Sequence, residues 1–222
     1  MEVWRSLMDG MAQLLNMLYQ VTVKIGLPSY ALAIVILTIS IKMILYPLTK
    51  KQMQSMVIMQ RLQPKITEIQ DKWKKRDPKK AQELIMQLYK DNNASPMAGC
   101  LPLLIQMPIL IALYRTLFGF TYINEAHAGF IWISSLSAKD PLMILPVLAA
   151  VTTFLQAKMT MTASDPTQRM MLYMMPLVIG WISLNLPSGM VLYWVVFNIV
   201  GMAQQYYINK QTLPLREGAT GK

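Results

Sequence analysis

The sequence predicts an all-α membrane protein with five transmembrane helices, an N-terminal interfacial amphipathic helix and a cytoplasmic helical hairpin. Three observations predict this fold class. Hydrophobic residues make up 54% of the 222 residues and charged residues only 14%, whereas a typical soluble domain has about 25% charged residues. The apolar residues gather in long runs, which suit helices that cross a bilayer. The Lys and Arg residues are concentrated in one polar segment between the first two runs.

The N-terminal element, residues 1–26, has the pattern of an amphipathic helix. Its apolar residues recur at steps of three and four, as at Leu7, Met11 and Leu14, while polar residues such as Asp9 fall on other faces. This segment is too polar to span a bilayer, so we expect it to lie in the extracytoplasmic interface. A soluble helix packed against the rest of the chain is the alternative.

The remaining boundaries follow from the apolar runs and the breaks between them. The first span is expected at residues 27–49, where Gly26 and Pro28 interrupt the preceding helix and Ser29 serves as N-cap. Prolines inside later runs are compatible with spans, because neighbouring helices satisfy the carbonyl groups that a proline frees. After the first span we expect a hairpin at 50–93, a second span at 97–119, an extracytoplasmic loop at 120–139, a third span at 140–159, a cytoplasmic loop at 160–167, a fourth span at 168–186, a fifth span at 189–208 and a cytoplasmic tail at 209–222.

The polar segment at 50–93 predicts two basic amphipathic helices joined by a turn. It holds eleven Lys or Arg residues against five Asp or Glu residues, a net charge of +6. The second helix has a clear start signal, with Asp77 as N-cap and Pro78 at the first helical position. Such a basic surface can be merely solvated, or it can contact anionic lipid headgroups or ribosomal RNA. We expect anionic lipids and no DNA, because the segment is tethered to the membrane at both ends and lacks the interleaved aromatic residues of a base-reading surface.

The distribution of Lys and Arg residues predicts the orientation of the chain. Apart from Lys42, sixteen of them lie in the hairpin, near the loop at 160–167 and in the tail, and four lie on the other side. Cytoplasmic loops carry the excess of Lys and Arg in membrane proteins. We therefore expect the N-terminus outside and the C-terminus in the cytoplasm.

Lys42 lies well inside the first apolar run. A lysine at a helix centre costs about 2.5–3.5 kcal/mol on insertion scales, so it needs a route to water or a function. The cytoplasmic end of the run, at Leu48, is six residues or about 9 Å away, within reach of a snorkelling side chain. However, helical side chains lean towards the N-terminus, which is outside in this orientation. We favour an internal hydrated position for Lys42, with snorkelling as the alternative.

Polar residues recur at helical spacing along three of the expected spans, and each stripe continues to the cytoplasmic end. A single polar side chain in a span usually just hydrogen-bonds to a neighbouring helix, for about 0.6 kcal/mol. Three stripes together with one lysine predict a shared, hydrated groove between these spans that opens to the cytoplasm. The residues expected to line this groove and to bind a substrate there are Lys42, Thr38 and Tyr46 in the first span, Gln106 in the second, Thr152 and Gln156 in the third, and Trp194 and Asn198 in the fifth.

The sequence lacks the residue sets on which most catalytic sites depend. One cysteine, Cys100, excludes a disulfide within the chain, and one histidine, His127, argues against a histidine metal site. No nucleophile–base pair or glycine-rich phosphate loop is present, so we expect no enzyme activity, cofactor or metal. No acidic residue lies deep in a span, which argues against a proton- or sodium-driven transporter. The twenty methionines are adaptable side chains that suit either ordinary packing or contact with varied apolar segments.

Several motifs in this order match a known family. They are Leu62-Gln63-Pro64-Lys65-Ile66 in the hairpin, Gly99-Cys100-Leu101-Pro102-Leu103-Leu104-Ile105-Gln106-Met107-Pro108-Ile109 in the second span, Asp140-Pro141 and Leu145-Pro146 in the third, and Pro187-Ser188-Gly189 with Leu192-Tyr193-Trp194 in the fifth. With these motifs the chain resembles the YidC family of membrane protein insertases over nearly its whole length. Since no large extracytoplasmic domain is seen, it resembles the compact forms of Gram-positive bacteria.

The resemblance implies five transmembrane helices around a hydrophilic groove, which is open to the cytoplasm and the lipid and closed outside. It implies that a positive residue of the first span, commonly arginine and here Lys42, receives the polar or acidic tails of client proteins, and that Gln156 and Trp194 are further groove positions. Lysine keeps the charge but lacks the planar fork of arginine. The expected function is that of an insertase of the bacterial plasma membrane, acting as a monomer on nascent membrane proteins, with the ribosome and the Sec translocon as candidate partners. A small-solute transporter or channel is the alternative, although the inverted repeats typical of transporters are not visible in the sequence.

Overall fold

The computed structural model describes residues 2–73, 76–95, 101–118, 120–160 and 166–211. Within these ranges the regular structure is helical, which confirms the all-α prediction. Cys100, most of the loop expected at 160–167 and most of the tail expected at 209–222 lie outside the described residues. The helices are α1 (Glu2–Lys24), α2 (Tyr30–Ile44), α3 (Tyr46–Trp73), α4 (Pro78–Asp91), α5 (Leu101–Leu117), the short 3₁₀ helix η2 (Glu125–His127), α6 (Ile144–Thr160), α7 (Pro166–Ser183) and α8 (Ser188–Gln211).

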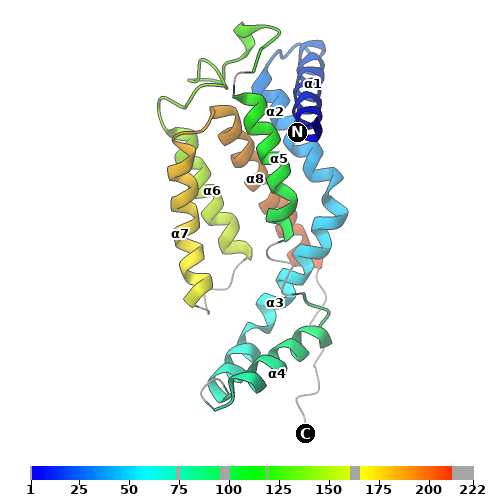
Figure 1. Cartoon of the computed structure of the whole chain (residues 1–222), viewed down its shortest axis with the longest axis vertical. Coiled ribbons are helices and arrows are strands. Elements are labelled where there is room, and N and C mark those ends of the chain that lie inside the picture. The colour runs from blue at the N-terminus through cyan, green and yellow to red at the C-terminus, as the bar shows by residue number, and fades with distance from the viewer. Residues whose placement is uncertain (1, 74–75, 96–100, 119, 161–165, 212–222) are drawn as a thin grey trace.

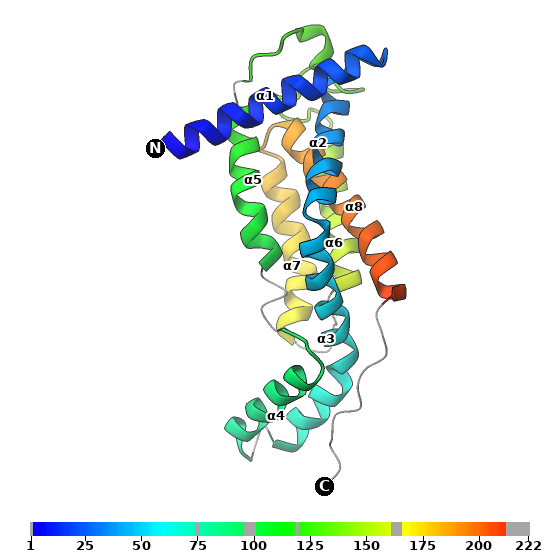
Figure 2. The same cartoon turned by 90° about the vertical axis from the view of Figure 1, so that its right-hand side faces the viewer.

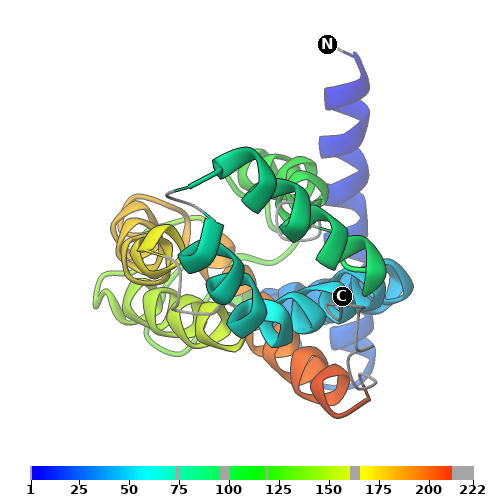
Figure 3. The same ribbon diagram turned by 90° about the horizontal axis from the view of Figure 1, so that it is seen from below.

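The helices form an elongated bundle with a different attachment at each end. α2, α5, α6, α7 and α8 run along the length of the bundle, and the hairpin of α3 and α4 projects from the lower end (Figure 1). α1 lies across the upper part of the bundle, as Figure 2 shows. Seen from the hairpin end, α6 and α7 lie side by side on one flank (Figure 3). The two ends are called the loop end and the hairpin end below.

α1 packs one apolar face on the bundle and leaves another exposed. Leu15 and Tyr19 are buried, whereas Met17 is 63% exposed. The ring of Tyr19 stacks on that of Tyr30 in α2, with centroids 4.0 Å apart. The Tyr19 hydroxyl also forms a 2.7 Å hydrogen bond with His127 Nδ1. These contacts tie α1 to α2 and to the segment around η2 at the loop end.

The segment expected as one span at 27–49 is divided between two helices. α2 starts behind Ser29, whose side chain caps it as predicted by accepting a 3.3 Å hydrogen bond from the Leu32 N–H. It ends at Ile44, and α3 starts at Tyr46 with its axis turned by 70°. Pro47 accounts for the break, because it has no N–H to donate to the carbonyl of Met43. The first hairpin helix therefore begins four residues before the expected boundary.

A helix that crosses a bilayer needs about 20 consecutive, predominantly apolar residues. No single described helix is both long enough and apolar enough. The bent pair of α2 and α3 meets the two criteria when its helices are taken together. The segments Leu104–Leu117, Ile144–Thr160 and Arg169–Ser183 are shorter apolar helices.

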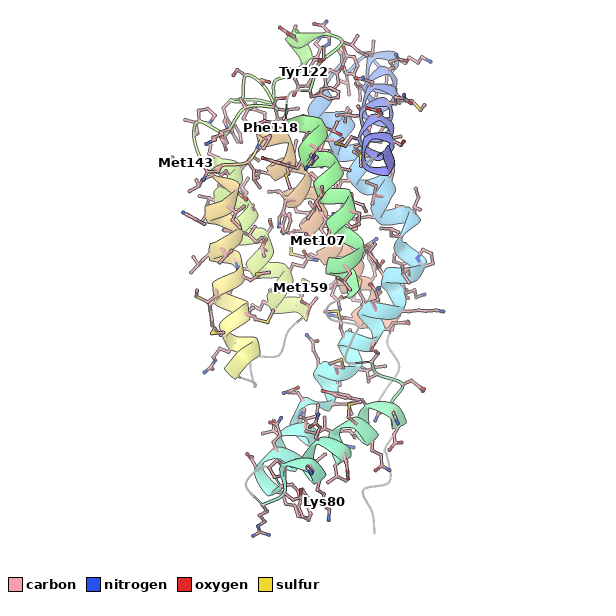
Figure 4. All side chains as sticks on the ribbon, in the orientation of Figure 1. Lys80, Met107, Phe118, Tyr122, Met143 and Met159 are labelled. Carbon is pink, nitrogen blue, oxygen red and sulfur yellow. The ribbon has the colours of Figure 1, made fainter. Side chains whose placement is uncertain are left out.

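The hairpin has a small apolar core of its own. Leu62 and Ile66 of α3 are buried against Leu88 of α4. The predicted start of α4 is confirmed, since the Asp77 carboxylate caps the helix by accepting a 3.0 Å hydrogen bond from the Lys80 N–H. Lys80, labelled at the hairpin tip in Figure 4, places its Nζ 4.1 Å from the centroid of the Trp73 ring. A cation over an indole face is favourable, so this contact helps to close the hairpin tip.

The start of α6 shows why the third helix is shorter than expected. The expected span begins at Asp140, but α6 begins at Ile144. The Asp140 carboxylate accepts hydrogen bonds from the N–H groups of Leu142 and Leu145, at 3.0 and 2.7 Å, and from Trp132 Nε1 at 2.9 Å. Asp140 therefore closes a turn ahead of the helix instead of forming its first residue.

Candidate functional site

A cavity of about 280 Å³ lies among α2, α3, α5, α6, α7 and α8. It occupies the half of the bundle next to the hairpin. Four of the eight predicted site residues line it, namely Lys42, Gln106, Gln156 and Trp194. The opposite half, at the loop end, is filled by a closely packed apolar core that includes Ile34, Leu113, Leu117, Leu136, Leu145 and Val191. The bundle is therefore solid near the loops and hollow near the hairpin.

Lys42 projects into this hollow half from the last turn of α2. Only 5% of the residue is exposed. Its Nζ lies 3.4 Å from the centroid of the Phe197 ring of α8. No Asp or Glu occurs in the five helices α2, α5, α6, α7 and α8, and no carboxylate among the described residues pairs with Lys42. The ammonium group is thus held by an aromatic face and not by an ion pair, which leaves it free to attract an anion.

Gly201 makes the close approach of Lys42 to α8 possible. A Cβ atom at this position would lie 3.1 Å from Lys42 Nζ and 2.6 Å from Gln156 Nε2. The latter distance is shorter than real Cβ contacts. The absence of a side chain at Gly201 therefore lets the lysine and the glutamine meet against the backbone of α8.

Asn198 connects α6 and α8 through a network of polar side chains. In the amide orientation that best satisfies both of its ends, Asn198 donates to Gln156 Oε1 at 2.5 Å and accepts from the hydroxyls of Thr152 and Thr153 at 3.1 and 2.9 Å. Trp194 Nε1 donates to Thr153 Oγ1 at 3.0 Å. Asn198 and Thr152 are buried and do not line the cavity. Asn198 holds Gln156, and Thr153 holds Trp194, and both of these held side chains line the cavity.

The other predicted site residues have different roles. Gln106 Nε2 donates a 2.6 Å hydrogen bond to the hydroxyl of Tyr193, which joins α5 to α8 beside the cavity. Thr38 is fully buried and its hydroxyl donates to the carbonyl of Ile34, 2.7 Å away in its own helix. Tyr46 is half-buried in the first turn of α3 and is not among the lining residues. Thr49, one turn further along α3, lines the cavity in its place.

Several residues at the site were not predicted as site residues, among them Phe197, Thr153 and Gln52. Phe197 gives no polar signal, although it lies one turn before Gly201 on the same face of α8. Thr153 is adjacent to a predicted residue, and Gln52 lies three residues after Thr49, where the stripe of the first span could have been continued. The extension was hidden by the 70° bend between α2 and α3, which turns the start of α3 towards the cavity.

Acidic and metal-binding side chains do not gather in the part of the chain that the structure describes. No three His, Cys, Asp or Glu side chains in this part lie close enough together to hold a metal ion. What the site offers is one buried cation, several amide and hydroxyl groups, and apolar walls that include Met53, Met56 and Met175.

The chain is similar in sequence to known proteins over most of its length. A family described as "60Kd inner membrane protein" matches residues 14–214. Two relatives named membrane protein insertase YidC are 45% identical, in Citrifermentans bemidjiense, and 47% identical, in Geotalea daltonii, each over 183 residues and 82% of this chain. The chain spans about a third of the length of these curated relatives, 34% in both cases.

A solved structure also resembles this chain. It is described as an active YidC insertase crystal structure with the first transmembrane domain resolved. The similarity has a TM-score of 0.70 at 27% sequence identity, and it covers 92% of this chain and 46% of the other. The arrangement of helices is therefore shared over nearly all of the chain.

Proposed function

The chain belongs to the 60Kd inner membrane protein family, and from this membership we propose that it is a membrane protein insertase of the bacterial plasma membrane. The names of its relatives support this function. Its proposed substrates are nascent membrane proteins, of which a short hydrophilic tail enters the cavity while the adjoining apolar segment moves into lipid. The cavity is the cytoplasmic part of a hydrophilic groove, and Lys42 receives the tail.

The contact between Lys42 and Phe197 supports a role in attracting acidic tails. A cation over an aromatic ring gains about 0.5–2 kcal/mol, which is less than a charged partner offers in a poorly hydrated site. A client carboxylate can therefore displace the ring as the partner of Lys42. Because lysine is a compact point charge with no planar fork, it attracts an acidic tail without fixing its orientation, so the tail can be released again.

The apolar walls of the cavity support a sideways exit for the client helix. Ile105 of α5 lies on one side, and Met175 and Ile179 of α7 lie on another. The outer face of α7 is exposed and apolar, as at Leu177 and Trp181. Transfer of apolar surface out of water gains about 25 cal/mol per Å². This free energy of transfer drives the client helix into lipid between α5 and α7 without a nucleotide.

The proposed function also implies an orientation of the chain relative to the membrane. Five spans place the N-terminus outside and the C-terminus in the cytoplasm, with α1 in the outer interface. The exposed basic residues Arg76, Lys79 and Lys80 at the tip of the hairpin support contact with anionic lipid headgroups. The protein acts as a monomer, with the ribosome or the Sec translocon as further partners.

The observation that carries this proposal is a buried lysine, without a carboxylate partner among the described residues, at the wall of a cavity. The test is reconstitution into liposomes with a single-spanning client that has an acidic N-terminal tail. We expect the wild-type protein to insert the client, and Lys42→Ala to lower the initial rate by about tenfold, since losing a charge-assisted contact costs about 1.5–3 kcal/mol.

Two controls separate the charge from other effects. Lys42→Arg retains the charge and should retain insertion, whereas Lys24→Ala changes an exposed lysine in the last turn of α1 and should have no effect. Equal insertion by the wild type and Lys42→Ala would exclude the role given to Lys42. Solute flux without any insertion would favour a small-solute transporter or channel.

A further inference from the structure

Three glutamines beside Lys42 contain buried amide atoms that have no partner. Among the described residues, five buried side-chain atoms lack a hydrogen bond, and four of these belong to Gln52, Gln204 and Gln205. Gln52 has neither Nε2 nor Oε1 paired, and the other two lack a partner for Oε1. All three side chains are more than nine-tenths buried. Within the part of the chain that the structure describes, unused hydrogen-bonding capacity is thus concentrated beside Lys42.

These glutamines lie at the hairpin side of Lys42. Gln52 and Gln205 both line the cavity. Gln205 is one turn beyond Gly201 in α8, the residue that contacts Lys42, and its Nε2 is held by Asn209 Oδ1 at 2.8 Å. Gln204 donates from its Nε2 to the carbonyl of Lys42 at 3.4 Å. A chain that enters the cavity from the hairpin end passes Gln52 and Gln205 before it reaches Lys42.

Leaving these atoms unpaired is unfavourable for folding. Each buried polar group without a partner has lost its hydrogen bonds to water and gained none in return, and an apolar side chain of similar shape would avoid this cost. Such groups in a native protein call for a specific explanation. A ligand that supplies the missing partners during the working cycle accounts for glutamine at these positions, whereas packing alone favours leucine.

The unpaired atoms specify the chemistry of the ligand. Three of the four are acceptors, so the ligand must donate N–H or O–H groups. A cationic donor is disfavoured because Lys42 shares the cavity and five of the helices around it, α2, α5, α6, α7 and α8, contain no acidic residue. The sixth, α3, has Glu68 and Asp71, which lie sixteen and nineteen residues beyond Gln52 and do not line the cavity. The backbone N–H of a peptide is a neutral donor, and every client carries it whatever its sequence. Gln52, with one free donor and one free acceptor, matches the C=O and N–H of an extended peptide.

We propose that Gln52 and Gln205 form a binding site for the extended backbone of the client tail, one step before Lys42. The proposal rests on the insertase function and adds a sequence-independent contact to the charge-dependent one at Lys42. The amide atoms are covered in this structure, so the cavity must widen for a chain to reach them. The flexible side chains of Met53 and Met56, on the same helix as Gln52, line the cavity and can change rotamer to allow this.

The test uses Gln52→Leu and Gln205→Leu in the full chain, reconstituted with a client whose tail is uncharged. We expect Gln52→Leu to leave the melting temperature unchanged or higher, because it removes two unpaired atoms. Gln205→Leu removes one unpaired atom but also the 2.8 Å hydrogen bond to Asn209, so its melting temperature should stay close to that of the wild type. We expect each substitution to lower the initial insertion rate by about fivefold, the effect of one hydrogen bond of about 1 kcal/mol. The matched control is Asn92→Leu, which changes the buried hairpin residue whose Oδ1 is the fifth unpaired atom, and it should insert the client at the wild-type rate.

A second measurement needs no variant. A synthetic client in which esters replace alternate amides of the tail lacks half of the backbone N–H donors but keeps the shape of the chain. The wild-type protein should insert it several times more slowly than the amide client, and Gln52→Leu should discriminate less between the two.

The outcomes separate this proposal from the function on which it rests. If the wild type inserts the amide client and both glutamine variants match it, or if the ester client is inserted as fast as the amide client, the backbone site is excluded while the insertase remains. An equal loss of insertion with Asn92→Leu would show that the effect is not specific to the cavity and would also exclude the site. If the wild type inserts no client, the insertase function itself is wrong.

Discussion

Gly201 is the residue at which the geometry of the cavity can be changed by one carbon atom. In Gly201→Ala the new Cβ would displace Lys42 Nζ and Gln156 Nε2, both at the ends of flexible side chains. We expect the free energy of unfolding to stay within about 1 kcal/mol of the wild type, because alanine also favours the helix by about that amount. The insertion rate of an acidic-tailed client should fall about fivefold, as Lys42 loses a position worth about 1 kcal/mol. Thermal unfolding and insertion, measured on the same preparation, check both expectations.

Gly10 provides the matched control for this substitution. It is exposed in α1, and a Cβ at this position would meet nothing within 4 Å. Gly10→Ala should therefore insert the client at the wild-type rate. If Gly201→Ala did so as well, the position of Lys42 against α8 would not matter for insertion.

At the level of single residues, helical spacing predicted the polar side of the site better than its apolar side. The stripes pointed to Lys42, Gln156 and Trp194, and these residues meet at the cavity. Spacing did not reveal that the hydroxyl of Thr38 donates to a carbonyl of its own helix. A threonine on any face of a helix can form this hydrogen bond, so its position in the stripe carries no information about it. Nor did it point to Phe197, since an aromatic residue in an apolar run has the same pattern whether it contacts lipid, core or a cation.

The hairpin of α3 and α4 is an element with a core of its own, so it should be possible to weaken it separately from the bundle. Leu62 is fully buried in this core. We expect Leu62→Ala to destabilise the hairpin by about 2–5 kcal/mol, from lost burial and the cavity left behind. Amide hydrogen exchange should then show faster exchange in α4 and unchanged protection in α6 and α8.

Met86 supplies the control in the same hairpin. It is 42% exposed in α4, so Met86→Ala should change stability by about 0.5 kcal/mol or less. If Leu62→Ala instead lowered protection throughout α6 and α8, the hairpin and the bundle would unfold as one unit. The 3.1 Å hydrogen bond from Gln60 Nε2 to the carbonyl of Met159, a residue marked in Figure 4, is one of the contacts between α3 and the bundle that would couple them.

At the level of helices, capping residues predicted where some helices start, whereas tertiary contacts determined the other helix boundaries. The caps at Ser29 and Asp77 could be recognised because each has an oxygen acceptor placed to bond the N–H three residues later. The division of the expected first span could not be located from hydropathy, because the apolar run continues across the break. Asp140 is also of a residue type that commonly serves as an N-cap. However, its carboxylate accepts a hydrogen bond from Trp132, eight residues away, and a linear pattern does not show this contact.

At the scale of the whole molecule, the two ends of the bundle differ in packing, charge and surface. The loop end is filled, with the Tyr19, Tyr30 and Tyr122 rings closely associated, and α1 presents exposed apolar residues such as Met17 beside it. The hairpin end is hollow and adjoins the basic segment. A cavity that is closed by the packed core at the loop end suits entry of a polar tail from the hairpin end, provided that the hairpin end faces the cytoplasm.

This orientation leads to a prediction that concerns the whole chain. Cys100, the single cysteine, is replaced by serine, and one new cysteine is introduced at an exposed position at each end, as Glu125→Cys in η2 or as Lys79→Cys in α4. A membrane-impermeant maleimide added to intact cells should label Glu125→Cys at once, and Lys79→Cys only after the membrane is permeabilised. Full labelling of both variants in detergent provides the control for reactivity. The excess of Lys and Arg residues near the hairpin is the physical reason for this outcome, since such segments are retained in the cytoplasm. The reverse pattern of labelling would place the cavity on the outer side, and a tail arriving from the ribosome could not then enter it.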